Sequence, residues 1–177
     1  MDPSRIIHFK KTEDIFDVVQ RLFNEQKTFL LNKIPCPVDI QHVGSSSILG
    51  ALTQADLDIQ IRVTKDNFEK TVEILRNFFD VKHSEDWTTE FASFVNTKNA
   101  LPTDYIVTIE DSRYDHFYKT RDCLKGHPKM LSKYNAMKRL YEGKKYSEYS
   151  DAKKLFFGGN GKVRFLDSIL VSEEDFE

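Results

Sequence analysis

The sequence contains little cysteine: Cys36 and Cys123 are the only two in 177 residues. Two cysteines cannot build a disulfide framework or a thiolate zinc site, so we expect both to be reduced thiols. Long hydrophobic runs are also lacking, since none approaches the roughly 18 residues that span a bilayer. Charges interrupt the first residues, MDPSRIIHFKK, which excludes the apolar region of a signal peptide. These absences predict a cytoplasmic protein without a membrane partner.

Glycine and proline are scarce, with 7 and 5 residues, and no Gly- or Pro-rich linker separates parts of the chain. Hydrophobic residues make up 40%, including 14 Phe and 7 Tyr, which is enough apolar surface for a core and excludes wholesale disorder. The length favours one domain over residues 1–177. We expect its sheet core over about residues 1–111 and a helical part over about residues 112–171.

The chain also lacks an excess of one charge: 26 Lys and Arg stand against 28 Asp and Glu, a net charge of -2. This balance argues against a surface that coats long nucleic acid. The charges are nevertheless segregated, with 12 basic and 18 acidic residues over 1–112, and 14 basic and 5 acidic residues over 113–164. One interpretation is a site with acids for metal and bases for phosphate. The alternative is a solvated helical surface.

The hydrophobic pattern predicts a layered α/β protein. Helical spacing indicates helices over residues 13–33 and 64–78, the first capped by Thr12, and several short helices from residue 112 onward. Alternation with a period of two predicts four strands, at residues 38–43, 56–63, 89–96 and 104–110. This order predicts a mixed β-sheet with helices packed on it, the C-terminal ones included.

The segment that carries chemistry links Gly44-Ser45 to Asp56-Leu57-Asp58, with ten residues between Ser45 and Asp56. Residues i and i+2 of a strand face the same side, so we expect the carboxylates of Asp56 and Asp58 to lie close together and to need a cation. Hard oxygen ligands suit Mg²⁺ or Mn²⁺, and two such ions can clamp the oxygens of a nucleotidyl transfer. Gly44 and Ser45 offer backbone N–H groups and a hydroxyl to a phosphate. The alternative is a pair of exposed acids without a ligand.

This combination resembles the signature of the DNA-polymerase-beta-like nucleotidyltransferase superfamily, in which Gly-Ser precedes Asp-hydrophobic-Asp by about ten residues. The resemblance implies a third carboxylate from a neighbouring strand. Asp104 is the natural candidate because it opens a strand, whereas Glu110 and Asp111 lie at the far end. We therefore expect Asp56, Asp58 and Asp104 to form one catalytic metal site. The alternative for Asp104 is an acid at the start of a strand with no ligand.

A closer resemblance, to the GrpB family (UPF0157), covers about residues 38–170. It rests first on QHVGSSSILGALTQADLDIQIRV at residues 41–63, where Leu49 replaces the proline that the family usually has. Downstream, the family's Arg-Asp-x-Leu, Tyr-x-x-Leu/Met-Lys and Tyr-x-x-Ala-Lys motifs resemble residues 121–124, 134–138 and 149–153. The resemblance implies a nucleotidyltransferase core, and it singles out three basic residues: Arg121, Lys138 and Lys153.

Two of these bases follow a tyrosine by four residues, Lys138 after Tyr134 and Lys153 after Tyr149, so each pair shares a helix face. A lysine beside an aromatic ring can hold a triphosphate while the base stacks. The alternative is a tyrosine in the core with the lysine stem reaching solvent. Arg121, which precedes Asp122, can equally belong to an internal helix-packing pair.

Together these residues predict a small metal-dependent nucleotidyltransferase that uses a nucleoside triphosphate and a small-molecule or protein acceptor. Asp56, Asp58 and Asp104 are expected to bind Mg²⁺ (or Mn²⁺) and to serve catalysis. The nucleotide phosphates are expected to bind Gly44, Ser45, Arg121, Lys138 and Lys153. The alternative is a non-catalytic nucleotide-binding or interaction module, because a fold does not determine a function.

Overall fold

The structure, a computed structural model, describes residues 2–158. These residues fall into two compact units: a sheet unit, Lys10–Arg121, and a helical unit that joins residues 2–9 to residues 122–158. The boundary lies inside helix α3 (Phe117–Gly126). The part of the predicted helical segment beyond residue 158 lies outside the described residues. The extent of a single domain over residues 1–177 stays a prediction.

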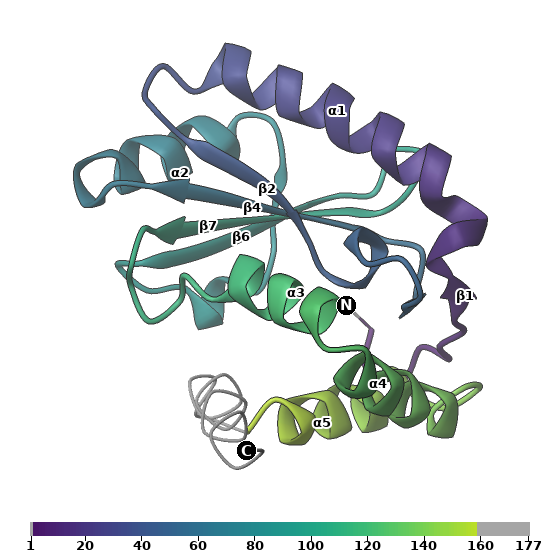
Figure 1. The fold of residues 1–177 in the computed structure, drawn as a ribbon. Helices are drawn as coiled ribbons and strands as arrows, with labels where there is room; N and C mark the ends of the chain where they lie inside the picture. Colours follow the sequence, from purple (N-terminus) through teal and green to yellow (C-terminus); the bar gives the residue numbers. More distant parts are fainter. Residues whose placement is uncertain (1, 159–177) are drawn as a thin grey trace, which may run out of the picture. The chain divides into compact units, whose positions relative to one another are not determined.

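A mixed five-stranded sheet forms the centre of the sheet unit (Figure 1), in the order β2-β4-β7-β6-β5. β4 and β7 are parallel, and the other neighbours are antiparallel. The strands are β2 (Asp39–Val43), β4 (Leu57–Val63), β5 (Asp80–Val81), β6 (Phe91–Asn96) and β7 (Thr103–Ile109). The predicted mixed α/β fold and its four strands are confirmed. β5, only two residues long, was not predicted.

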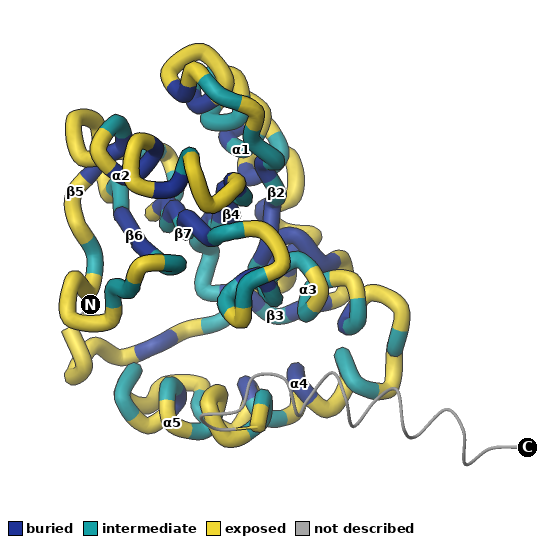
Figure 2. Tube along the Cα trace, turned by 90° about the vertical axis from the view of Figure 1, so that its left-hand side faces the viewer, coloured by how far each residue is buried: buried dark blue, intermediate teal, exposed yellow. Residues whose placement is uncertain are grey.

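Two helices cover one face of this sheet: α1 (Phe16–Lys33) and α2 (Phe68–Arg76). Each is preceded by one turn of 3-10 helix, η1 (Thr12–Ile15) and η3 (Lys65–Asn67). The alternate residues of β4 that face these helices, Leu57, Ile59, Ile61 and Val63, are completely buried. They form one core with apolar side chains of both helices: Val19, Leu22, Leu30, Phe68, Val72 and Leu75. Figure 2 shows this burial as dark blue along β4 and β7.

The opposite face of β4 is polar, because Asp58, Gln60 and Arg62 alternate with the core residues. The loop before α3 covers it with Asp115, whose side chain is 0% exposed. The carboxylate of Asp115 accepts hydrogen bonds from Nε (2.7 Å) and Nη2 (2.6 Å) of Arg62 and from the Gln60 amide (2.9 Å). It also accepts one from the backbone N–H of Asp111 (2.8 Å). A buried charge is tolerable here because each oxygen has partners.

The first residues of the sheet unit are held by a small ladder that the sequence pattern did not reveal. β1 (Lys10–Lys11) pairs antiparallel with β3 (Leu52–Thr53). Thr12, predicted as a helix N-cap, instead donates its hydroxyl to the carbonyls of Ala51 (3.0 Å) and Ser45 (3.2 Å). The N-cap prediction was therefore wrong, since the tertiary contact takes the hydroxyl that a cap would use.

The helical unit holds α4 (Pro128–Leu140) and α5 (Tyr146–Phe156). The N-terminal segment is fastened to the turn between them, because the N–H of Ile7 donates to Lys144 (2.9 Å) and that of Gly143 to Ile7 (3.0 Å). The predicted short C-terminal helices are confirmed as far as the structure describes them. Among residues 2–158, no helix has the length and apolar character needed to cross a membrane.

Breaking the Asp115 ion pair should lower stability markedly. In Asp115→Asn the guanidinium of Arg62 loses a buried carboxylate but keeps its ion pair with Asp39. Removing one partner of a buried pair costs roughly 3–5 kcal/mol when the other charge is left alone, so we expect a loss near the lower end of that range. Urea unfolding at pH 7 measures this loss. The control is Asp151→Asn, which removes an exposed carboxylate paired with Lys154 and should cost less than about 1 kcal/mol.

The difference in unfolding free energy between the native chain and Asp115→Asn should depend on pH. Burial tends to raise the pKa of Asp115, but the hydrogen bonds from Arg62 and Asp111 outweigh it and hold the pKa below its ordinary value. The stabilisation is therefore fully present above about pH 4, the ordinary aspartate pKa, and disappears as the pH falls through the lower pKa of the folded protein. If the difference in unfolding free energy between the native chain and Asp115→Asn instead grew as the pH fell, this account would be contradicted.

Candidate functional site

Strand register places the predicted aspartates at neighbouring positions on the polar face of the sheet. Asp58 of β4 lies opposite Asp104 of β7 and, on its other side, opposite Val43 of β2. Asp56 lies two residues before Asp58, directly before β4 begins. The site therefore forms where β2 runs into its loop and where the parallel strands β4 and β7 begin.

Gly44, the first residue of that loop, lies against one of these aspartates. Its φ of +72° belongs to the region that favours glycine, and its ψ is -176°. A Cβ atom built on Gly44 would lie 1.9 Å from Oδ2 of Asp58. The candidate phosphate loop and the candidate metal ligand are thus in direct contact. Only a residue without a side chain permits this approach.

The loop after Gly44 is a short 3-10 turn, η2 (Ser45–Ser47), with several supports. The Ser47 hydroxyl donates to the carbonyl of Gly44 at 2.6 Å. The backbone N–H of Gly50 donates to the carboxylate of Glu13 in η1 at 2.6 Å. Together with the Thr12 hydroxyl on the Ser45 carbonyl, these bonds fix the loop to the start of the sheet unit.

Arg121, which the sequence analysis predicted to bind phosphate, lies beside β2. Its Nη1 donates to the side-chain oxygen of Gln41 (2.9 Å) and to the carbonyl of His42 (2.8 Å), two residues before Gly44. The His42 ring stacks on Phe23 of α1 with centroids 5.1 Å apart. Arg121, in the middle of α3, thus fastens this helix to β2, and its phosphate-binding role stays a prediction.

Lys138 and Lys153 belong to the helical unit. Lys138 is 1% exposed, and its Nζ lies 4.0 Å from the centroid of the Tyr134 ring. Tyr149 is buried in the same unit, with its ring 5.2 Å from that of Phe9. Both tyrosines are therefore core residues, whereas Lys153 is exposed in the last turn of α5. The phosphate-binding role of the two lysines stays a prediction.

One residue at the site was missed by the sequence prediction. Lys82, directly after β5, forms an ion pair with Asp104 through its Nζ and the Oδ2 of the carboxylate. Both side chains are largely buried, at 18% and 16% exposed. No sequence pattern could reveal Lys82, because β5 consists of two exposed residues without alternation.

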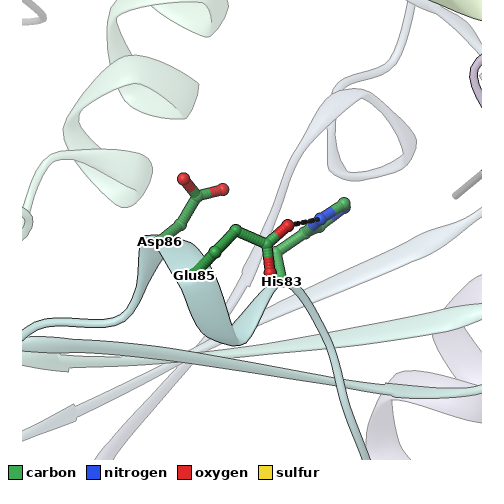
Figure 3. A group of neighbouring side chains, drawn as sticks. All are labelled: His83, Glu85 and Asp86. Carbon is green, nitrogen blue, oxygen red and sulfur yellow. Dashed lines mark hydrogen bonds and ion pairs between the residues drawn. The ribbon is translucent and has the colours of Figure 1, made fainter.

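The carboxylates provide hard oxygen donors, but they do not form a three-ligand cation site as they stand. Among the described residues, the one group with three ligand atoms within 4.8 Å of one another is His83, Glu85 and Asp86, not the three aspartates. Figure 3 shows this exposed group on η4 (Ser84–Asp86), with Glu85 turned toward His83 at 3.2 Å. Exposed groups of this kind are common on protein surfaces without an ion.

Asp56 and Asp58 fit a divalent cation better than the full set does. Both are partly buried, and the hydroxyl of Thr53 donates to Oδ1 of Asp56 at 3.4 Å. Carboxylate oxygens are the donors that Mg²⁺ and Mn²⁺ prefer, and the sequence places these two aspartates only two residues apart. The carboxylate of Asp104 is paired with Lys82.

Comparison with known proteins gives similar sequences and similar folds. A UPF0157 protein of Vibrio cholerae is 24% identical over 150 residues, which is 85% of this chain and 79% of that protein. The crystal structure of the conserved protein GrpB from Enterococcus faecalis is 13% identical, covers 86% of this chain and 94% of its own, and superposes with a TM-score of 0.63. That likeness shows a shared fold.

A weaker and partial likeness links the chain to Cid1, solved in complex with the UTP analogue UMPNPP. It is 13% identical, has a TM-score of 0.49, and covers 73% of this chain but 40% of that chain. The family model for GrpB protein matches residues 16–159, most of the sequence. The chain therefore belongs to the GrpB family.

Proposed function

We propose that the chain is a metal-dependent nucleotidyltransferase that uses a nucleoside triphosphate and a small-molecule or protein acceptor. The observation that carries the proposal is the contact between Asp58 and Gly44, with only 1.9 Å between Oδ2 and the place of a Cβ on Gly44. A divalent cation on Asp58 and a phosphate on the loop would then be neighbours. This adjacency is what nucleotidyl transfer requires of a metal site.

Each residue has a definite part in the proposal. Asp56 and Asp58 would hold Mg²⁺, which supplies positive charge to the polyphosphate when it is bound. Gly44 lets the phosphate approach the backbone, and Ser45 adds a hydroxyl. Arg121 orients the end of β2 through the carbonyl of His42 and lends a fixed positive charge to this edge of the sheet.

The remaining predicted residues have weaker support. Asp104 was predicted as a third ligand or general base, but its carboxylate is paired with Lys82. Lys138 lies over an aromatic ring in the helical unit, and Lys153 is exposed there. The phosphate-binding roles of Lys138 and Lys153 and the general-base role of Asp104 stay predictions. Mg²⁺ dependence, the cytoplasmic location and the absence of long nucleic acid as a partner are likewise part of the proposal.

A second candidate function is a non-catalytic module that binds a nucleotide. The ion pair of Asp104 with Lys82 favours it, because a carboxylate held by an ammonium group is a poor general base. This candidate predicts that nucleoside triphosphates raise the melting temperature, since a ligand that binds only the folded state stabilises it. It predicts no metal-dependent turnover.

Pyrophosphate release separates the two candidates. The purified chain is incubated with each of the four nucleoside triphosphates and Mg²⁺ or Mn²⁺, with pooled small-molecule and protein acceptors. The enzyme hypothesis expects release with at least one nucleotide, and a decrease of about 100-fold or more in Asp56→Asn, since losing a metal ligand removes several kcal/mol of transition-state stabilisation.

The control for this assay is Asp66→Asn, which removes an exposed acid in η3 and should leave release unchanged. Equal release by native chain and Asp56→Asn would contradict the enzyme hypothesis. Clear nucleotide stabilisation without any release would support the non-catalytic module instead.

Replacing Gly44 by alanine should disturb the loop and the aspartate together. The new Cβ would displace the carboxylate of Asp58, so Gly44→Ala should lose nucleotide binding as well as stability. The matched control is Gly143→Ala, where φ is almost the same, +73°, but no atom lies within 4 Å of the added Cβ. This control should cost only the roughly 1–2 kcal/mol of a left-handed backbone. Calorimetric unfolding and nucleotide titration measure both effects, and equal losses in the two variants would show that contact with Asp58 is unimportant.

A further inference from the structure

Lys82 is held in place by its own backbone. Its N–H donates to the carbonyl of Ser93 at 3.0 Å. Its carbonyl accepts from the Ser93 hydroxyl (2.7 Å) and from the indole N–H of Trp87 (3.0 Å). Trp87 is itself packed between Phe94, with centroids 5.1 Å apart, and the guanidinium of Arg76, 4.6 Å from its ring. Three hydrogen bonds and a packed indole therefore fix the point from which the Lys82 side chain starts.

From this point the side chain reaches across a strand. Lys82 follows β5, Asp104 belongs to β7, and β6 lies between these strands in the sheet. Along β6, Ser93 hydrogen bonds to Lys82 and Val95 lies opposite Asp104, so both face the same side of the sheet. The ammonium group arrives at Oδ2 of Asp104 in a largely buried position.

The ammonium group of Lys82 lies at the position where a metal ion would otherwise meet Asp104. Asp104 lies opposite Asp58 in the parallel register, and like charges on neighbouring positions of one face repel unless positive charge offsets them. In a site of two cations, a third carboxylate would bind one of the two ions. Here Lys82 already supplies that charge, and salt screens a partly buried ion pair less than an exposed one.

We infer that Lys82 is a built-in counter-cation of Asp104, so that the site takes a single divalent cation through Asp56 and Asp58. This inference rests on the proposed function, because it concerns the metal site of the same reaction. Lys82 is a positioning residue: it keeps the carboxylate of Asp104 away from the cation. Asp104 is then not a metal ligand in the native protein, although the fold brings it beside one.

The test measures Mn²⁺ binding to the full chain by electron paramagnetic resonance, with Mn²⁺ alone as the probe. Lys82→Gln removes the ammonium and frees Asp104 to become a third ligand, so we expect Mn²⁺ to bind about tenfold or more tightly, a change of 1.4 kcal/mol or more. The double variant Lys82→Gln/Asp104→Asn has the same net charge as the native chain, because it removes one positive and one negative charge. Its Mn²⁺ affinity should return to within about threefold of the native value, less than 1 kcal/mol.

Two further variants serve as controls. Lys82→Arg keeps a positive charge on Asp104 and should bind Mn²⁺ like the native chain, which shows that position 82 tolerates substitution. Lys98→Gln removes an exposed lysine and should also leave the affinity unchanged, which excludes an effect of net charge. Circular dichroism checks that every variant is folded.

The outcomes separate this inference from the proposed function. An unchanged or weaker Mn²⁺ affinity in folded Lys82→Gln would overturn the role of Lys82 while the native metal site stands. A double variant that binds Mn²⁺ tenfold more weakly than the native chain would show that Asp104 is already a ligand, and would overturn it too. If the native chain binds no Mn²⁺ at millimolar concentration, the proposed metal-dependent function fails and this inference fails with it.

Discussion

The structure of the sheet unit depends on the two-sided character of its central strand, β4. One face of the strand is excluded from water: it carries four apolar residues that are fully buried in the core with α1 and α2, namely Leu57, Ile59, Ile61 and Val63. The same alternation forces Asp58, Gln60 and Arg62 onto the other face. A polar row at the centre of a sheet is costly unless its hydrogen bonds are made within the protein. The other residues of the polar face therefore supply hydrogen bonds and charges to these side chains.

Different parts of the row are satisfied in different ways. At one end, Arg62 and Gln60 are bound to the buried carboxylate of Asp115, which attaches the segment before α3 to the sheet. At the other end, Asp58 lies against the backbone of Gly44, and the neighbouring carboxylate of Asp104 is bound to Lys82. The first end is a closed structural network. The second end combines carboxylates with a glycine loop, and for this reason we place the candidate chemistry there.

The sequence predicted the fold well where the signal is local. Strict alternation located β4, and apolar spacing located the helices, because burial of one face is the dominant energy term in both. Gly44, Asp56 and Asp58 could be singled out because they belong to a short motif, Gly-Ser followed by Asp-x-Asp, and their roles stay predictions. The long-range partners were not predictable in this way. Lys82 and Thr12 act through contacts that only the folded chain creates, and neither belongs to a periodic pattern.

The central claim is that Asp56 and Asp58 hold a divalent cation next to a nucleotide on the Gly44 loop. The most direct measurement is a crystal structure of the chain with Mn²⁺ and a nonhydrolysable nucleoside triphosphate, in which anomalous scattering locates the ion. The account predicts one Mn²⁺ peak between the carboxylates of Asp56 and Asp58, with the phosphates along Gly44 and Ser45 and the Lys82–Asp104 pair intact. Mn²⁺ and nucleotide bound elsewhere, or not bound at all, would contradict it.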